Sequence, residues 1–529
     1  MNRFTKGRHR NNGNAIIRFF LKNYPMNDIM IWRCKILKTT RLLENDLELI
    51  LSELKCNIGN GMLGLGLLID KLHDDNEKSS LMELKDFLQN NIYLAEDTEY
   101  LSTYLYFFAN VLSDIGDEEK AVLNFRKAII DKSFKDLNCQ TKAAIHVNLG
   151  NIMNKHGRYA EALESYGKSL EESPDFLMAL GNLGICLKTL SYSLYDINHR
   201  IIALRFSYSY LTKAIEQNKD RKILHATAQN GFNKAIEEID EIFSINNINK
   251  EITEFKTFDV RSKKEDSYKK WCLDNTLFLN PMNDIIKHTV SAHDVVHLPN
   301  MTFDINDDSI YGYLSMFNQL KQEYVSARFL YYDSINNKKF HFSDRAVGLI
   351  NPLSYQEYSY NIEKCKIAFR IIYSLLDKIG FFINEYYNLG IDKSRVNFSK
   401  AVNALKLKQD NIYNWSIDAL CWVNKEINFG NEINPYSLKI NNIRNHLEHK
   451  FFQVITYGNY DCVEINDILT MGRMEFEEIT LNLIKIVRSA IISLSLAIHR
   501  NENIKTPVSE EWLTMPIPHT GFIDDKWKV

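Results

Sequence analysis

Proline is scarce in this sequence, with nine residues among 529, and the strongest helix breaker is therefore absent from most of the chain. Long stretches instead repeat apolar residues at the 3.6-residue period of amphipathic helices. Together these two features predict an all-α protein.

Cysteine occurs eight times, but no two cysteines form a CxxC pair. This pattern argues against a zinc ribbon and against a disulfide framework, and it favours a reducing, cytoplasmic location. The chain also lacks a run of 18 apolar residues without charge, so we expect neither a transmembrane helix nor a membrane partner. The N-terminal 20 residues have no apolar core of the kind found in secretory signals.

A strong charge of either sign is missing as well, because the formal net charge is −3 and the pI is about 6.6. Any nucleic-acid site must therefore be a local patch. The N-terminus is locally basic, with Arg3, Lys6, Arg8 and Arg10 close together. This stretch is either a solvated arm or an arm that touches RNA.

Two motifs typical of ligand sites lack the context that such sites need. Gly59, Gly61 and Gly64 spell GxGxxG, but a helical pattern rather than a buried strand precedes them, so we expect a flexible loop between helices. His293 and His297 are four residues apart, yet Pro299 follows and no third metal ligand is evident. We therefore predict structural histidines, with no metal and no cofactor.

Internal repetition marks the region from 95 to 245. Seven residues fall at tetratricopeptide spacing, namely Leu149, Gly150, Gly157, Tyr159, Ala162, Tyr166 and Pro174. Leu183 and Gly184 follow 34 positions after Leu149 and Gly150, which is one repeat length. The region resembles the tetratricopeptide repeat (TPR) family, which implies a solenoid of helical hairpins. Such surfaces bind proteins or peptides, or simply pack against their neighbours.

Beyond residue 310 the helical pattern resumes, and four or five long antiparallel segments predict a bundle. The sequence is thus divided into five parts: an N-terminal helical region with a basic arm (1–94), TPR-like repeats (95–245), a linker or irregular subdomain (246–309), the helical bundle (310–500) and a C-terminal tail (501–529).

Residues 443–450, IRNHLEHK, concentrate charged and polar side chains on one predicted helix of the bundle. Asn445 and His449 are four apart and share a face, as do Arg444 and Glu448 one position earlier. Arg444 and His449 are five apart and point about 140° from each other. A second copy of the helix would bring a second Arg–His set alongside, so this geometry favours a dimer.

Arg444, a polar residue at Asn445 and His449 resemble the RxxxxH signature of HEPN-domain ribonucleases, whose fold is a bundle of four or five helices. Segments KQEYVSARFLYYDS, LLDKIGFFINEYYNLGI, FLNPMNDI and HDVVHLPNMTF resemble the branch of that superfamily that lies behind TPRs. The resemblance spans roughly 265–500 together with the repeats.

The resemblance implies metal-independent RNA cleavage by the RNA's own 2′-hydroxyl. In it His449 is the general acid or base, Arg444 clamps the phosphate, and Asn445 orients the phosphate or the histidine. Glu448 is expected to hold Arg444 in place, whereas His446 has no counterpart in the signature.

We therefore predict a cytoplasmic, homodimeric endoribonuclease that is controlled by its TPR region and acts as a toxin or in antiphage defence. Its expected substrate is a tRNA loop or other single-stranded RNA. One alternative is a non-catalytic adaptor whose repeats bind a peptide while the bundle dimerises. Another is a HEPN domain that binds RNA or a nucleotide without cutting it.

Overall fold

The computed structural model describes residues 43–515 except 76, 253–254, 256–261, 305–308, 338, 351–354, 410–413, 429–432, 457–462, 466 and 506–511. The basic N-terminal arm and most of the C-terminal tail lie outside these residues. The described chain is mainly helical, which confirms the predicted all-α class. It divides into two compact units.

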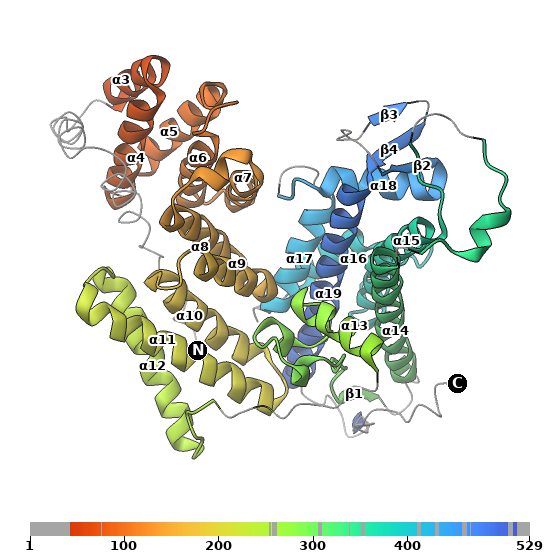
Figure 1. Ribbon diagram of the computed structural model, residues 1–529. Coiled ribbons are helices and arrows are strands. Elements are labelled where there is room, and N and C mark those ends of the chain that lie inside the picture. Colours follow the sequence, from red (N-terminus) through yellow and green to blue (C-terminus); the bar gives the residue numbers. More distant parts are fainter. Residues whose placement is uncertain are drawn as a thin grey trace. The chain divides into compact units, whose positions relative to one another are not determined.

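Unit 1 comprises residues 1–192, 197–253 and 429–435. Its described α-helices follow one another along the chain (Figure 1): α3 (Leu43–Cys56), α4 (Ile58–Asp75), α5 (Lys78–Asn91), α6 (Leu101–Ile115), α7 (Glu118–Ile130), α8 (Cys139–Lys155), α9 (Tyr159–Glu172), α10 (Leu177–Ser193), α11 (Ile197–Arg221) and α12 (Ala226–Ile245). Short 3₁₀ turns lie at Ile92–Leu94 and Lys132–Asp136.

The helices α6 and α7 form one hairpin, and α8 and α9 form the next. Gly116 and Gly157 lie in the two connecting turns with φ of 91° and 69°, a conformation that glycine adopts without steric cost. Gly150 lets α8 approach α9 closely, since a Cβ there would lie 2.8 Å from the ring of Tyr166. This region is compatible with the predicted repeats.

The expectation of a flexible loop at the GxGxxG match is wrong, because Gly59, Gly61 and Gly64 all lie within α4. A Cβ on Gly61 would lie 2.6 Å from the backbone nitrogen of Leu54, so the glycine allows α4 to pack against α3. A sequence period alone could not show this, because the close approach depends on the partner helix.

Unit 2 comprises residues 193–196, 254–428 and 436–529. Its α-helices are α13 (Lys263–Asp274), α14 (Ser309–Asn336), α15 (Tyr360–Tyr386), α16 (Phe398–Lys408), α17 (Trp415–Asn428), α18 (Ser437–His449) and α19 (Arg473–Ile504). Short 3₁₀ turns lie at Pro281–Asp284, Thr289–Ser291 and Phe342–Ala346.

Helix α19 forms the core of unit 2, where α14, α15, α17 and α18 pack around it (Figure 1). By length and composition alone, this described helix could cross a membrane. However, 83% of its most apolar 18-residue window is buried. Packing among the bundle helices therefore accounts for its apolar sequence, as in the core helix of a soluble protein.

Five short strands accompany the helices in the described part of unit 2. Strands β2 (Phe451–Ile455), β4 (Ile468–Gly472) and β3 (Val463–Ile465) form a sheet in that order, in which β2 pairs parallel and β3 antiparallel with β4. Strands β1 (Met301–Asp304) and β5 (Trp512–Met515) pair antiparallel. The three-stranded sheet follows α18 directly, so it fixes the direction in which the chain leaves that helix (Figure 1).

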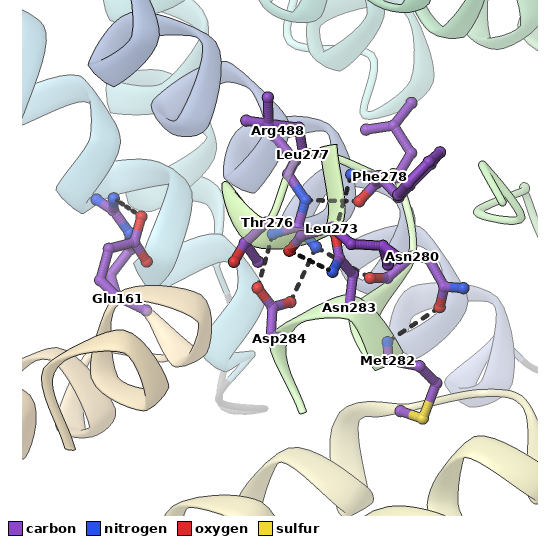
Figure 2. Close-up of polar contacts among 12 residues, drawn as sticks. Glu161, Leu273, Thr276, Leu277, Phe278, Asn280, Met282, Asn283, Asp284 and Arg488 are labelled. Carbon is purple, nitrogen blue, oxygen red and sulfur yellow. Dashed lines mark hydrogen bonds and ion pairs between the residues drawn. The ribbon is translucent and has the colours of Figure 1, made fainter. Parts of the chain in front are cut away.

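Two buried arginines attach the irregular segment at 277–294 to the bundle helices. Arg488 of α19 bonds both carboxylate oxygens of Asp284, at 2.8 and 3.0 Å, and donates to the carbonyl of Phe278 (Figure 2). Arg328 of α14 makes the equivalent two-pronged contact with Asp294, at 2.9 and 2.8 Å. Bidentate pairing compensates the desolvation of both charges, and the segment is therefore a packed part of the unit.

Candidate active site

Helix α18 carries the IRNHLEHK motif and owes its position to an apolar stripe. Ile440, Ile443 and Leu447 follow the i, i+3, i+7 spacing of one helix face, and all three are buried. Burial of each side chain stabilises the fold by roughly 1.5–3 kcal/mol. The helix ends at His449, and the extended backbone of Lys450 leads into β2.

The buried stripe leaves the three predicted catalytic residues on the accessible side of α18. Asn445 and His449 are exposed, and Arg444 is half-buried. The Nη1 of Arg444 donates to Oδ1 of Asn445 at 3.1 Å. Within the described residues, no hydrogen bond or ion pair engages the His449 ring, so its imidazole is open to a ligand.

Helix α15 supports Arg444 through the ring of Tyr373. The guanidinium carbon lies 5.7 Å from the centre of the Tyr373 ring, within the range of a cation–π contact. The Tyr373 hydroxyl bonds Oδ1 of Asn441 at 3.0 Å, and the Asn441 amide donates to the carbonyl of Ile427 at 2.7 Å. The arginine thus rests on a ring that is itself fixed to α18 and α17.

Burial raises the pKa of Tyr373, and the nearby Arg444 charge partly opposes this increase. The phenol is therefore neutral near pH 7 and donates a hydrogen bond to Asn441. It serves as a positioning group for Arg444 and not as a base.

The structure does not contain the predicted ion pair between Glu448 and Arg444. The ion pair of Glu448 is with Arg370 of α15, at 3.6 Å between Oε1 and Nε. Arg444 instead bonds Asn445 and covers Tyr373. The i, i+4 spacing made Arg444 the obvious partner, but an arginine on the neighbouring helix competes for the same carboxylate.

His446, which the signature leaves out, faces the protein interior. Its exposed fraction is 4%, and Nδ1 lies 2.8 Å from the carbonyl oxygen of Asn442. Because a carbonyl only accepts, Nδ1 carries the proton in this contact. Nε2 lies 3.2 Å from Glu464 of β3. No hydrogen bond engages Nε2 within the described residues, so His446 packs between α18 and the small sheet and is almost fully shielded from solvent.

Lys450, directly after α18, pairs with one acidic residue of β3 and one of the turn between β3 and β4. It bonds Glu464 at 3.1 Å and Asp467 at 2.8 Å. The Lys450 ammonium holds the pKa of both carboxyl groups below their usual values. Both carboxylates are therefore charged near neutral pH and neutralise Lys450.

Two further acidic residues of the bundle brace helices away from the motif. Glu323 of α14 pairs with Lys378 of α15 at 2.5 Å. Asp377 accepts from the backbone N–H of Phe398 at 3.3 Å.

The histidine pair at 293 and 297 also has structural contacts, since His297 Nδ1 lies 2.7 Å from the carbonyl oxygen of Leu298. Asp294, which lies between them in the sequence, forms an ion pair with Arg328. In the described ranges, no group of three or more His, Cys, Asp or Glu side chains could hold a metal ion.

A helical bundle with Arg-x₄-His on a late helix is the arrangement that the sequence resemblance to HEPN domains led us to expect. Comparison with family models agrees, since residues 305–501 match the family described as LA2681-like HEPN. The match supports a HEPN-superfamily domain at residues 305–501. A search of the curated proteins found no significant match. The matched range covers α14 to α18 and most of α19, so the candidate site lies within it.

Sequence reasoning missed Arg370, Tyr373 and Asn441. The first two lie some 70 positions before the motif on another helix, and their contacts depend on how α15 and α18 align. Neither residue belongs to a recognisable spacing pattern. The one available signal was the amphipathic register of α15, which leaves Arg370 off the apolar stripe.

Proposed function

We propose that the HEPN domain of this chain is an endoribonuclease that needs no metal ion and uses Arg444, Asn445 and His449. The observation that carries the proposal is the arrangement on α18. A supported arginine and an unengaged histidine lie at one accessible helix end, inside a domain of a superfamily associated with ribonuclease or nucleotide-related activity.

The chemistry follows from the RNA itself. A base removes the proton of the 2′-hydroxyl, the 2′-oxygen attacks the adjacent phosphorus, and the bond from phosphorus to the 5′-oxygen breaks. An acid protonates the leaving 5′-oxygen, so the products are a 2′,3′-cyclic phosphate and a 5′-hydroxyl. His449 supplies the acid or base function, because an imidazole changes protonation near neutral pH more readily than other side chains. Arg444 stabilises the charge on the equatorial phosphate oxygens.

The substrate that suits this chemistry is unpaired RNA, such as a tRNA loop. In-line attack needs the 2′-oxygen, the phosphorus and the leaving oxygen on one line, and stacked A-form helices do not permit this geometry. A 2′-hydroxyl is indispensable, so the proposal excludes DNA as a substrate.

A homodimer would complete the site by placing two copies of α18 side by side. Three large apolar side chains near the motif support this part of the proposal: Leu438 is 46% exposed, Ile367 41% and Phe451 71%. Leu438, Asn445 and His449 share one row of α18, because they differ by seven and four positions. A dimer interface along this row would bury Leu438 and bring together two Arg–His sets.

We further propose that the helical hairpins of unit 1 are TPR-like and control the nuclease through a protein or peptide ligand. A nuclease directed at unpaired RNA needs such restraint in the cytoplasm, and a role as a toxin or in antiphage defence follows by analogy with other restrained nucleases.

The test incubates the full-length protein with total RNA in the presence of EDTA. We expect cleavage by the wild type and its loss in Arg444→Ala and His449→Ala. His446→Gln is the matched control, because it changes a buried histidine of the same helix. Growth arrest on expression, relieved by His449→Ala, extends the test to cells that supply a trigger. If neither assay distinguishes the variants from the wild type, the nuclease is excluded and the peptide-binding adaptor is favoured.

A further inference from the structure

The alignment of α15 and α18 brings a second arginine to the candidate site. Three contacts show how α15 lies along α18 and the first residues of β2. The contacting pairs are Lys366 with Phe452, Arg370 with Glu448, and Tyr373 with Arg444. Because residue numbers rise on one side and fall on the other, the two segments run antiparallel. Arg370 therefore lies on the His449 side of Arg444.

The two arginines are associated with positions along α18 whose separation suits consecutive phosphates. Arg370 meets Glu448, and Glu448 is four residues from Arg444 on α18, which corresponds to about 6 Å along the helix. Successive phosphates of an unstacked strand are separated by a comparable distance. One arginine can thus contact the scissile phosphate while the other contacts its neighbour.

The contact between Arg370 and Glu448 is weak enough to be replaced by RNA. At 3.6 Å, the Nε to Oε1 distance exceeds that of a hydrogen bond, and the two side chains are 46% and 42% exposed. In the part of the chain that the structure describes, Arg370 makes no other polar contact. Its two Nη groups therefore remain open to a phosphate, which can accept two parallel bonds.

We propose that Arg370 binds the phosphate next to the scissile one on the His449 side, and that Glu448 occupies this arginine until RNA displaces it. The ligand is then a single-stranded RNA with at least two consecutive phosphodiesters, not a mononucleotide. The inference rests on the proposed function for the identity of the scissile phosphate, but it concerns binding and is tested without cleavage.

The experiment measures binding of a fluorescein-labelled, unpaired RNA of about 12 nucleotides by anisotropy, over a series of salt concentrations. All proteins are full-length and carry His449→Ala, so that the RNA stays intact. Arg370→Gln removes the proposed contact, and Glu448→Gln releases the arginine. The matched controls are Lys378→Gln and Glu323→Gln, because Lys378 of α15 and Glu323 of α14 form a partly exposed ion pair away from the motif.

We expect Arg370→Gln to bind about five- to tenfold more weakly than its parent and to lower the slope of log K against log salt by about 0.7, which is the loss of one phosphate contact. Lys378→Gln should change binding less than twofold. Glu448→Gln should bind about threefold more tightly than Glu323→Gln, and this gain should vanish when Arg370→Gln is also present.

Two results overturn the inference. Equal affinity and salt slope in Arg370→Gln and its parent would show that the arginine does not touch RNA, and cleavage by the wild type would still leave the proposed nuclease intact. Absence of any RNA binding by the parent would exclude the contact as well. If the wild type then also failed to cleave RNA, the proposed function would fall with it.

Discussion

Because Tyr373 supports Arg444, we expect its ring to affect the cleavage rate and its hydroxyl to affect the stability of the fold. Tyr373→Leu removes the ring that lies 5.7 Å from the guanidinium, and a half-exposed cation–π contact contributes roughly 1 kcal/mol. If that energy holds Arg444 in its reactive position, kcat/KM falls about fivefold. Tyr373→Phe keeps the ring and loses only the 3.0 Å bond to Asn441, which lowers the free energy of unfolding by about 1 kcal/mol.

Single-turnover cleavage of a labelled RNA and urea unfolding measure the two quantities separately. Tyr313→Leu is the control, since this tyrosine also joins two bundle helices, through its 3.3 Å bond to the Glu385 carbonyl, without touching the motif. We expect it to lower stability and leave the rate per folded molecule unchanged. Equal cleavage rates for Tyr373→Leu and the wild type would refute the view that the ring positions Arg444.

Three further predictions concern the fold. Arg488→Leu leaves the Asp284 carboxylate buried without its partner, and urea unfolding should show a loss of about 3–5 kcal/mol, whereas a loss under 1 kcal/mol would contradict the role of this pair. Gly61→Ala should cost about 1–3 kcal/mol in the same assay because its Cβ meets the Leu54 backbone, while Gly167→Ala, with open space around it, should be neutral or stabilising. Burial lowers the pKa of His499 to about 3, so below pH 6.5 the unfolded chain binds a proton that the folded chain does not. The contribution of His499 to the free energy of unfolding should therefore decline by about 1.4 kcal/mol per pH unit between pH 6 and pH 4. His499→Gln should remove this slope. Equal pH profiles of stability for the variant and the wild type would disprove the prediction.

The helices of the bundle could be predicted from sequence because their apolar period is local information. The sequence predicts four or five long helices beyond residue 310, and α14 at Ser309–Asn336 and α15 at Tyr360–Tyr386 are two of them. The motif helix was likewise expected, and its buried stripe of Ile440, Ile443 and Leu447 is readable from spacing alone. Gly157, one of the residues at repeat spacing, lies in a turn between two helices, since its need for positive φ is also local.

What sequence reasoning could not supply depends on contacts between distant segments. The three-stranded sheet after α18 is built from strands of three to five residues, too short to show a clear period. The same holds for Arg328 and Arg488, which look like surface residues until their partners Asp294 and Asp284 are in place. At the site, the partner of Glu448 was misassigned because a neighbour on the same helix is visible in sequence and Arg370 on α15 is not.

The central claim is that the RNA's own 2′-hydroxyl is the nucleophile in a reaction served by Arg444 and His449. The most direct measurement compares two synthetic RNAs that differ only in a 2′-O-methyl group at the mapped cleavage site, in the presence of EDTA, with product ends identified by mass spectrometry. We predict a 2′,3′-cyclic phosphate and a 5′-hydroxyl from the unmodified RNA, and no cleavage at the methylated position. Cleavage of the methylated RNA at the same position, or products with a 5′-phosphate, would contradict the mechanism.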